Sequence, residues 1–382
     1  MTSKIGKELT RVGKQILNLP YDTYHKLTAT SRYDRVTSKQ TVLHNGAETR
    51  GDKIAIYLIF PNSGLLPSHK RAIAYIKDAG YAPFVVSNLP LSDADCTTLA
   101  KTCWKVMERP NVGYDFGGYR DAILSMSNDL DLLKRLVILN DSSWFPVNDG
   151  PNWLAQAENL GVDFAGAANS YGIQRVAREK YMQIDWKFSD ARRNFYYGSF
   201  ALSIGPAMLR AKKFLPFWQN MKLTEDKYKV VKRGEIALSQ FAVKNGFTHA
   251  ATADLQKLPQ TLSQMSFDEI KRLSAELIFW EEPSMKTAQT HAFEQVKGVP
   301  EPQARAVLEN LILAVIARYS SFYAAPRMMM MHFGFQFLKK TPAKDNQQNS
   351  DTLDDVANLI TGTLGDTIKA EVTTIRIENG FV

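Results

Sequence analysis

Short hydrophobic blocks alternate with helix-like blocks over the first half of the chain. The helix-like blocks repeat their apolar residues three and four positions apart, whereas the hydrophobic blocks have the length of a strand. The predicted strands are residues 53–60, 82–87, 104–108 and 136–140, and the predicted helices are 68–79, 92–102 and about 118–127. This alternation predicts an α/β fold with a mostly parallel sheet and helices on both faces. The block 136–140 is the most apolar, so we expect it to be central and buried.

The pattern is less regular after residue 150. A polar stretch rich in arginine and aromatic residues, 169–197, separates predicted strands at 163–167 and 200–204, and we interpret it as a long functional loop. Further predicted elements are helices at 207–222, 234–245, 266–279 and 301–323, a strand at 248–252, a polar linker at 341–351 and an amphipathic helix at about 352–370. The last third is therefore expected to be helical.

The first 40 residues differ from the rest in pattern and charge. Residues 4–19 combine an apolar helical stripe with a basic opposite face, and Pro20 ends the pattern. With eight Lys/Arg and three Asp/Glu, residues 1–40 contribute +5 to the net charge of +8. An amphipathic helix that binds an anionic membrane surface through residues 1–20 has this pattern. A helix that docks on the protein's own core fits it equally well.

Composition and length limit the class of protein. The 382 residues are 45% hydrophobic and 11% aromatic, which excludes global disorder and allows a large core without a disulfide or metal. No segment has 18 uninterrupted apolar residues and no secretion-signal pattern opens the chain, so we expect a cytoplasmic protein, peripheral on the inner face of the cell membrane. We divide the chain into a basic arm (1–50), an α/β domain (51–260), a helical extension (261–340) and a linker with a terminal helix (341–382).

The two cysteines, Cys96 and Cys103, are interpreted as ordinary helix-face thiols in a reducing compartment. Two thiols cannot complete a tetrahedral zinc site, and no histidine cluster lies near them in the sequence.

Candidate chemistry lies where the predicted strands end, because ligands of open parallel sheets bind at the carboxyl ends of the strands. Asn62 follows the first strand, Asn88 the second, and a glycine-rich stretch the third; the fourth ends in Asn140, Asp141 and Ser142. The glycine-rich stretch contains Asn111, Gly113, Asp115, Gly117, Gly118 and Arg120. It suits phosphate binding at a helix start, with an arginine for a pyrophosphate, although a tight turn explains the glycines too.

Asp141 is the candidate metal ligand, because a carboxylate at the end of a buried strand could hold Mg²⁺ or Mn²⁺ beside a diphosphate. A simple cap at the strand end is the alternative.

Three segments resemble the rhamnan synthesis protein F family over roughly residues 52–255. They are NVGYDFGGYRDAI, LVILNDSSWFP and RGEIALSQFAVKNGF. The resemblance implies a GT-A-like fold and an inverting glycosyltransferase that uses a nucleotide-diphosphate sugar, with rhamnose as the sugar suggested by the family alone. It also implies a lipid-linked or growing saccharide as acceptor in bacterial cell-surface polysaccharide synthesis, such as O-antigen or capsule.

The chain departs from the family pattern in three places. A His-x-Gln-Ser segment is expected before the later strand, but only Ser199 matches in Tyr196-Tyr197-Gly198-Ser199. Glu282-Pro283 replaces an Asn-Pro pair, and Asn140-Asp141-Ser142 replaces the Asp-x-Asp of many GT-A enzymes. These departures bear on acceptor recognition, for which Tyr197 and Ser199 are candidates, and on metal dependence.

An inverting transfer needs a carboxylate that removes the acceptor proton and positive charge at the leaving diphosphate. Glu235 in the third family-like segment is our first candidate for the base, and Asp185 and Asp190 are alternatives. Arg192 and Arg193 could neutralise the diphosphate. For Glu235, a helix-start acid stabilised by the helix dipole is the competing interpretation.

A non-catalytic protein that binds a sugar nucleotide or organises a polysaccharide complex is the alternative function. Nucleic acid is not expected as a partner, because the positive charge is concentrated in the arm and no nucleic-acid module is recognised. No oligomeric state is predicted.

Overall fold

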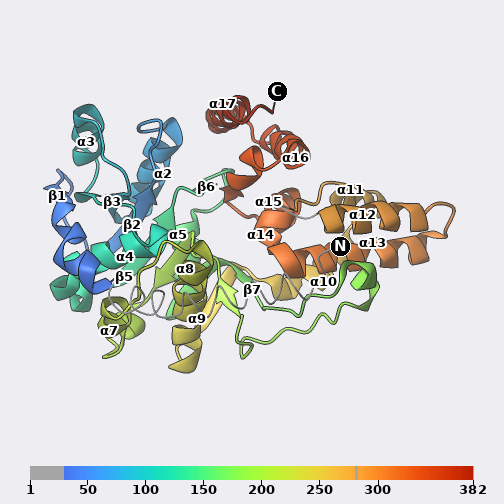
Figure 1. Ribbon diagram of the computed structural model, residues 1–382, viewed down its shortest axis with the longest axis horizontal. Coiled ribbons are helices and arrows are strands. Elements are labelled where there is room, and N and C mark those ends of the chain that lie inside the picture. Colours follow the sequence, from blue (N-terminus) through green and yellow to red (C-terminus); the bar gives the residue numbers. More distant parts are fainter. Residues whose placement is uncertain (1–29, 280–282, 382) are drawn as a thin grey trace, which may run out of the picture.

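The computed structural model describes residues 30–279 and 283–381 (Figure 1). The predicted helix at 4–19 and Glu282 lie outside these residues. Among the described residues, no helix is both long enough and apolar enough to span a membrane.

A nine-stranded sheet forms the centre of the α/β part. Four neighbouring strands are parallel, in the order β4 (Lys105–Glu108), β3 (Ala82–Ser87), β2 (Lys53–Ile59) and β5 (Arg135–Asn140). β9 (Ala201–Ile204) follows antiparallel, then β7 (Phe164–Ser170) and β10 (His249–Ala253), while β1 (Val42–Asn45) closes the other edge and β8 (Tyr196–Tyr197) pairs with β7. The predicted α/β class with its mostly parallel central sheet is confirmed, and it agrees with the GT-A-like fold that the resemblance implies.

The order of the strands reverses at β2. The chain first moves outward through α2 (Pro67–Asp78) to β3 and through α3 (Asp93–Ala100) to β4. It then returns through α4 (Tyr114–Ser125) to β5 on the other side of β2. Right-handed crossovers therefore place α4 on the face opposite to α2 and α3. The carboxyl ends of β2 and β5 form the topological switch point, where open α/β sheets bind ligands.

Helices flank the second half of the sheet and form the rest of the molecule. They are α5 (Trp153–Asn159), α6 (Pro206–Leu209), α7 (Phe214–Gln219), α8 (Lys227–Arg233), α9 (Glu235–Lys244), α10 (Leu258–Gln264), α11 (Phe267–Ala275), α12 (Pro283–Gln295), α13 (Glu301–Tyr319), α14 (Ser321–Ala324), α15 (Pro326–Phe333), α16 (Gln347–Ala357) and α17 (Gly362–Glu378). Short 3-10 turns are η1 (Thr37–Gln40), η2 (Ser127–Leu132), η3 (Arg178–Gln183), η4 (Leu255–Lys257) and η5 (Thr341–Lys344). Figure 1 shows α11–α13 projecting from the sheet, α17 beside α2, and α16 next to α17.

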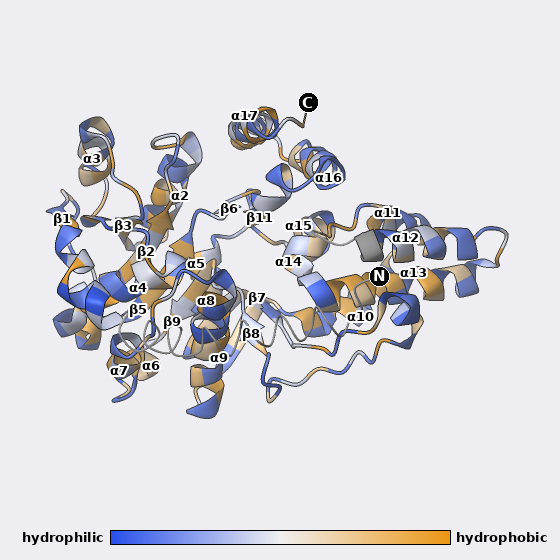
Figure 2. Ribbon diagram, in the orientation of Figure 1, coloured by the Kyte–Doolittle hydropathy of each residue, from blue (hydrophilic) through white to orange (hydrophobic). Residues whose placement is uncertain are grey.

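Two hydrophobic cores support this arrangement. The larger one joins the sheet to α2, α4, α5 and the helical extension. The smaller one joins α16 and α17 to β6 (Ser143–Trp144) and β11 (Leu338–Lys339). These two short strands pair antiparallel, and β6 follows shortly after the end of β5 in the sequence. In Figure 2 the helices carry hydrophobic and hydrophilic residues on different parts of their surface, as expected for helices that bury one face.

Several sequence-based boundaries are wrong. The predicted helix 207–222 is two helices, α6 and α7, separated by residues 210–213. The helix 301–323 ends at Tyr319, where Ser320 takes a φ of 69°. The predicted linker 341–351 forms η5 and the start of α16, and the last helix is divided before Gly362, whose φ is 67°. α4 begins at Tyr114 rather than near residue 118.

Candidate functional site

Asp141 lies at the switch point and connects the ends of β2 and β5. Its Oδ2 accepts a hydrogen bond from the backbone N–H of Phe60 (2.8 Å) and lies 3.2 Å from Nε2 of the buried His69. Burial acts to raise the pKa of Asp141, but His69, Lys340 and the Phe60 N–H outweigh it, and the pKa is lowered. Asp141 is therefore a fixed, ionised carboxylate at physiological pH.

Asp115 reaches the same edge from the first turn of α4. Its Oδ2 accepts a hydrogen bond of 2.8 Å from Nδ2 of Asn140, while Oδ1 of Asn140 accepts the backbone N–H of Ser142 at 3.1 Å. Burial raises the pKa of Asp115 to about 6, and the charges of Asp141 and Glu235 act in the same direction. Asp115, Asn140, Asp141 and Ser142, which the sequence predicted separately, thus form one cluster.

Glu235, at the start of α9, joins this cluster from the second half of the sheet. Its Oε1 accepts the backbone N–H of Ser199 (2.7 Å), the residue that precedes β9 by two positions. Burial raises the pKa of Glu235, although Ser199 and Lys339 act to lower it. The Glu235 carboxylate therefore binds another segment of the chain, and its role is not limited to interaction with the start of its own helix.

A glycine allows the start of α9 to approach α4 closely. A Cβ added to Gly234 would lie 2.3 Å from Cγ of the Phe116 ring. Because Gly234 and Phe116 each adjoin a site carboxylate, this contact determines how near Glu235 and Asp115 can come. A small pocket lies between the same segments, lined in part by Gly113, Leu223 and Gly234.

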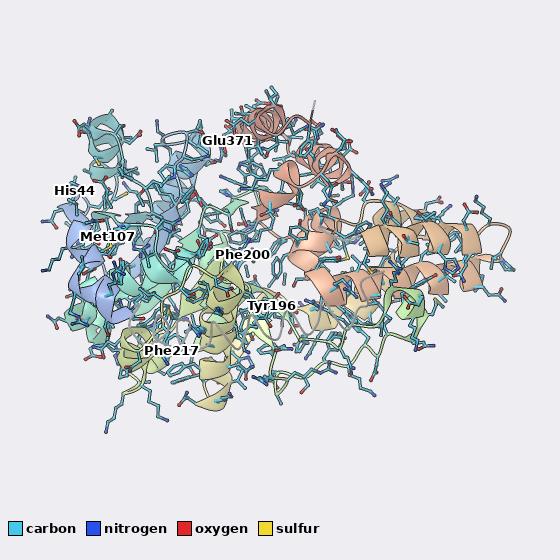
Figure 3. The ribbon with its side chains drawn as sticks, in the orientation of Figure 1. His44, Met107, Tyr196, Phe200, Phe217 and Glu371 are labelled. Carbon is cyan, nitrogen blue, oxygen red and sulfur yellow. The ribbon has the colours of Figure 1, made fainter. Side chains whose placement is uncertain are left out.

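Lys339 is the positive charge of the cluster, and sequence reasoning missed it. It lies in β11, whose pairing with β6 brings it next to Ser142: Nζ donates to Oγ of Ser142 at 2.9 Å and lies 4.0 Å from the centroid of the Phe200 ring. Burial lowers the pKa of Lys339 to about 8, while Glu235 and Asp115 act to raise it. Figure 3 labels Phe200 and Tyr196 at the centre of the molecule, where the sheet meets the C-terminal segments.

The adjacent Lys340 connects the cluster to the C-terminal helices. Its Nζ lies 3.9 Å from Oε2 of Glu371, and burial lowers its pKa against the opposing effect of Asp141. Glu371, on α17, is buried and accepts hydrogen bonds from the backbone and hydroxyl of Ser68 (2.9 and 2.7 Å) and from Nε1 of Trp144 (2.8 Å). Since Ser68 precedes His69, α17 is linked to both sides of Asp141.

Other predicted residues have contacts within the protein. Oδ1 of Asn88 accepts from Nη1 of the buried Arg109 at 2.6 Å. The Arg120 guanidinium is buried, binds both carboxylate oxygens of Asp34 (2.8 and 2.9 Å) and donates to the Trp218 carbonyl. Arg120 would have to exchange these partners before it could bind a pyrophosphate.

The glycines of the predicted phosphate loop are required by packing. Gly113 has a φ of 79° and precedes α4, where only glycine adopts the conformation easily. Gly117 and Gly118 lie inside α4, and an added Cβ would lie 2.0 Å from the Val112 carbonyl oxygen or 2.2 Å from Cδ1 of Leu58. Asn62 and Asn111 are exposed in the loops after β2 and β4.

The predicted site residues in the long loop 169–197 have surroundings that differ from those of the Asp141 cluster. Asp185 is exposed and pairs with Lys187 at 2.9 Å, and Asp190 lies 3.5 Å from Nε2 of His249. Arg192 and Arg193 lie in the same loop, and the Tyr197 hydroxyl bonds Nδ1 of His249 at 2.7 Å in the core. None of these five residues has a recorded hydrogen bond to Asp115, Asp141 or Glu235 among the described residues.

The metal prediction can be tested against the chemistry of these residues. Mg²⁺ and Mn²⁺ favour oxygen ligands and are often held by one or two carboxylates together with substrate phosphates. Asp141 fits this requirement, because His69 and the Phe60 N–H orient its carboxylate, as hydrogen-bonding partners of metal ligands do. The cluster can thus provide an oriented carboxylate, carboxylates of raised pKa and a half-buried ammonium group within one site.

Comparison with known proteins identifies a family and a relative. The model of the family described as rhamnan synthesis protein F matches residues 84–324. An uncharacterized protein, y4gN, of Sinorhizobium fredii (strain NBRC 101917 / NGR234) is 30% identical over 246 residues, which cover 64% of this chain. The chain spans 60% of the length of that relative.

The solved structures to which the chain shows a likeness are much more distant. The mannosyltransferase Ktr4p from S. cerevisiae in complex with GDP is 9% identical with a TM-score of 0.26, covering 52% of this chain and 68% of its own. S. aureus TarS 1-349 is 8% identical with a TM-score of 0.25, covering 86% of this chain and 88% of its own.

Proposed function

The chain belongs to the rhamnan synthesis protein F family, and from this premise we propose that it is a glycosyltransferase. It moves a sugar from a nucleotide-diphosphate donor to a lipid-linked or growing saccharide in bacterial cell-surface polysaccharide synthesis. Rhamnose is the sugar that the family description suggests. The observation that carries the proposal is that Glu235, Asp141 and Lys339 all lie close enough to Asp115, near the switch point of the sheet, for their charges to shift its pKa.

Glu235 is the proposed general base. In an inverting transfer, the acceptor oxygen attacks the anomeric carbon while its proton passes to a carboxylate and the diphosphate leaves with the bonding electrons. Glu235 is held by Ser199 and has a pKa raised by burial, so it is a stronger base than an exposed glutamate. Asp185 and Asp190 remain alternative candidates for the base. Both are exposed, and Asp185 pairs with Lys187 and Asp190 with His249, so we rank them below Glu235.

Lys339 is the proposed partner of the leaving diphosphate. Its recorded hydrogen bond goes to a neutral hydroxyl, so the ammonium can donate further hydrogen bonds into the site. A preorganised cation opposite developing negative charge stabilises the transition state. This role was expected for Arg192 and Arg193 and is assigned to Lys339 because of its position beside Ser142.

Asp141 is the proposed ligand for Mg²⁺ or Mn²⁺. Bound beside the donor, the ion would neutralise phosphate charge. His69 and the end of β2 hold the carboxylate in place whether or not the ion is bound. Asn62, Asn88, Asn111 and the α4 start remain proposed surroundings of the donor, and Tyr197 and Ser199 remain proposed acceptor-side residues.

We place the protein on the inner face of the cell membrane, with residues 1–20 on the anionic surface. The arm 1–50, the α/β domain 51–260, the extension 261–340 and the tail 341–382 remain the proposed division. β11 lies at the C-terminal end of the extension and pairs with β6 of the α/β domain. We propose that its Lys339 completes the site of that domain.

The proposal is tested with the full chain. A thermal-shift screen of nucleotide sugars should reveal a stabilising donor, because a ligand that binds the native state raises the unfolding temperature. The donor is then incubated with a lipid-linked acceptor mimic, and the glycosylated product is measured by mass spectrometry. Glu235→Gln should keep donor binding and lose transfer, since it keeps the shape but not the basicity of the side chain.

Two outcomes would contradict the proposal. Transfer by Glu235→Gln at the wild-type rate would exclude Glu235 as the base. Stabilisation by a donor without turnover on acceptors of several classes would favour the non-catalytic, sugar-nucleotide-binding alternative.

A further inference from the structure

A second group of metal-ligating side chains lies at the edge of the sheet, two strands away from β2. His44 on β1, Cys96 on α3 and Glu108 at the end of β4 bring one ligand atom each within 4.8 Å of one another. Nε2 of His44 lies 2.9 Å from Oε1 of Glu108, and Sγ of Cys96 lies 3.4 Å from the same oxygen. Figure 3 labels His44 at this outer edge, away from Phe200 in the centre.

The register of the strands creates the group. In the antiparallel β1–β4 pair, Val42 is opposite Glu108 and His44 is opposite Val106, so His44 and Glu108 are diagonal neighbours on one face. α3 runs just before β4 and places Cys96 over that face. β1 was not predicted from the sequence, so the proximity of His44 to Cys96 could not be foreseen.

The three side chains are accessible and oriented. Glu108 and His44 have side-chain exposures of 18% and 39%, so an ion can enter from solvent. The second carboxylate oxygen of Glu108 accepts the backbone N–H of Leu91 at 2.8 Å, which fixes the group in the way that metal-ligating carboxylates are commonly fixed.

We propose that His44, Cys96 and Glu108 bind a zinc ion, with water as a fourth ligand. A thiolate, an imidazole and a carboxylate together are ligands that zinc accepts and magnesium does not favour. Tetrahedral bonds of about 2.0–2.3 Å separate ligand atoms by about 3.3–3.8 Å. The present separations of 2.9 Å and 3.4 Å therefore need only small side-chain shifts.

Zinc binding would replace the hydrogen bonds among His44, Cys96 and Glu108 by metal–ligand bonds. The Cys96 thiol loses its proton to solvent, and the zinc–sulfur bond replaces the contact with Glu108. The ion would then join β1, α3 and β4, three elements of one sheet edge. The proposal goes beyond the transferase function and does not depend on it, because the site shares no residue with the Asp141 cluster.

The test uses the full chain, freed of metal by a chelator and of any histidine tag. Zinc is titrated against a chromophoric competitor, and cobalt is used as a spectroscopic substitute, because a cobalt–thiolate bond gives a near-ultraviolet charge-transfer band. We expect one zinc per chain and a thiolate band. Cys96→Ser should abolish the band and weaken zinc binding at least 10-fold, and Glu108→Gln should weaken zinc binding by about 10- to 100-fold.

The second cysteine provides the matched control. Cys103→Ala removes the other thiol, which is buried, and should leave the band and the zinc affinity unchanged; Asp141→Asn should also keep the band. Circular dichroism of each metal-free variant shows whether it folds. The proposal is overturned if the folded wild-type chain binds less than half an equivalent of zinc, or if the band survives in Cys96→Ser.

Discussion

The charged residues of the candidate site perturb one another in opposite directions, which makes the reaction sensitive to pH. Burial lowers the pKa of Lys339 to about 8, so its ammonium is lost as the pH rises through that value. If Lys339 binds the leaving diphosphate in its protonated form, as we propose, kcat/KM should fall above about pH 8. Below about pH 6, protonation of Asp115 should lower it as well. Burial also raises the pKa of Glu235, so protonation of the proposed base should add to this acidic decline.

Replacement of Lys339 by arginine isolates the alkaline side of this profile. Arginine stays protonated throughout the accessible range, so Lys339→Arg should flatten the decline above about pH 8 even if its overall rate is lower. A pH profile of kcat/KM for both proteins provides the measurement. An unchanged alkaline decline in Lys339→Arg would show that another group causes it.

Removal of the Lys339 charge should weaken donor binding. A hydrogen bond to a charged group contributes about 1.5–3 kcal/mol, so Lys339→Met should raise the Kd for the nucleotide-diphosphate donor about 10- to 100-fold. Lys344→Met is the control, because Lys344 is exposed on η5. Equal donor affinities of the two variants in isothermal titration calorimetry would contradict the role of Lys339.

Metal removal tests Asp141 separately. EDTA should lower the transfer rate of the wild-type protein, and added Mg²⁺ or Mn²⁺ should restore it, because an ion held by Asp141 would help Lys339 to neutralise the diphosphate. Asp141→Asn should be slow with or without the ion. A wild-type rate that is insensitive to EDTA would refute the metal prediction.

Residues of the site were predictable where they follow a predicted strand or, like Glu235, lie in a family-like segment. Asp115, Asn140, Asp141 and Ser142 could be found because parallel strands bring their carboxyl ends to one edge. Lys339 follows Ser142 by nearly 200 positions, and nothing near it in the sequence indicates that β11 pairs with β6. Arg120 was selected for its place in the glycine-rich stretch, and its contacts with Asp34 could be foreseen only from the tertiary structure.

At the scale of elements, the close approach of α9 to α4 depends on Gly234. A methyl group there would collide with the Phe116 ring, so Gly234→Ala should lower the free energy of unfolding by about 1–3 kcal/mol and reduce transfer. Gly51→Ala is the control, because its nearest neighbour would be 3.6 Å away; we expect a change within about 0.5 kcal/mol. Chemical denaturation measures both, and equal stabilities would mean that α9 shifts freely.

Helices and strands could be predicted where the sequence carries a hydropathy pattern, and not where it carries none. The strands β2, β3 and β5 were found within one residue of their bounds, because buried parallel strands leave continuous apolar runs. The short strands β1, β6, β8 and β11 have two to four residues and leave no periodic pattern. Helix boundaries marked by a positive φ, at Ser320 and Gly362, depend on local backbone geometry that hydropathy does not record.

At the scale of the whole molecule, Glu371 connects the C-terminal helices to the site. Glu371→Ala would leave the Ser68 and Trp144 donors without their buried acceptor, which should cost about 2–4 kcal/mol of unfolding free energy and also displace Lys340. Glu378→Ala, an exposed change on the same helix, should cost less than about 0.5 kcal/mol. Similar melting temperatures of the two variants would indicate that α17 is held by its apolar face alone.

The uneven charge of the chain leads to the remaining prediction at this scale. Residues 1–40 hold +5 of the net +8, which leaves +3 for the other 342 residues, so the arm is the part most attracted to an anionic surface. Deletion of residues 1–20 should abolish sedimentation with liposomes that contain anionic lipid, and salt should weaken the binding of the intact chain. If the helix instead docks on the protein's own core, the deletion lowers the melting temperature and leaves liposome binding unchanged. The two interpretations of the arm therefore predict opposite results in the same pair of measurements.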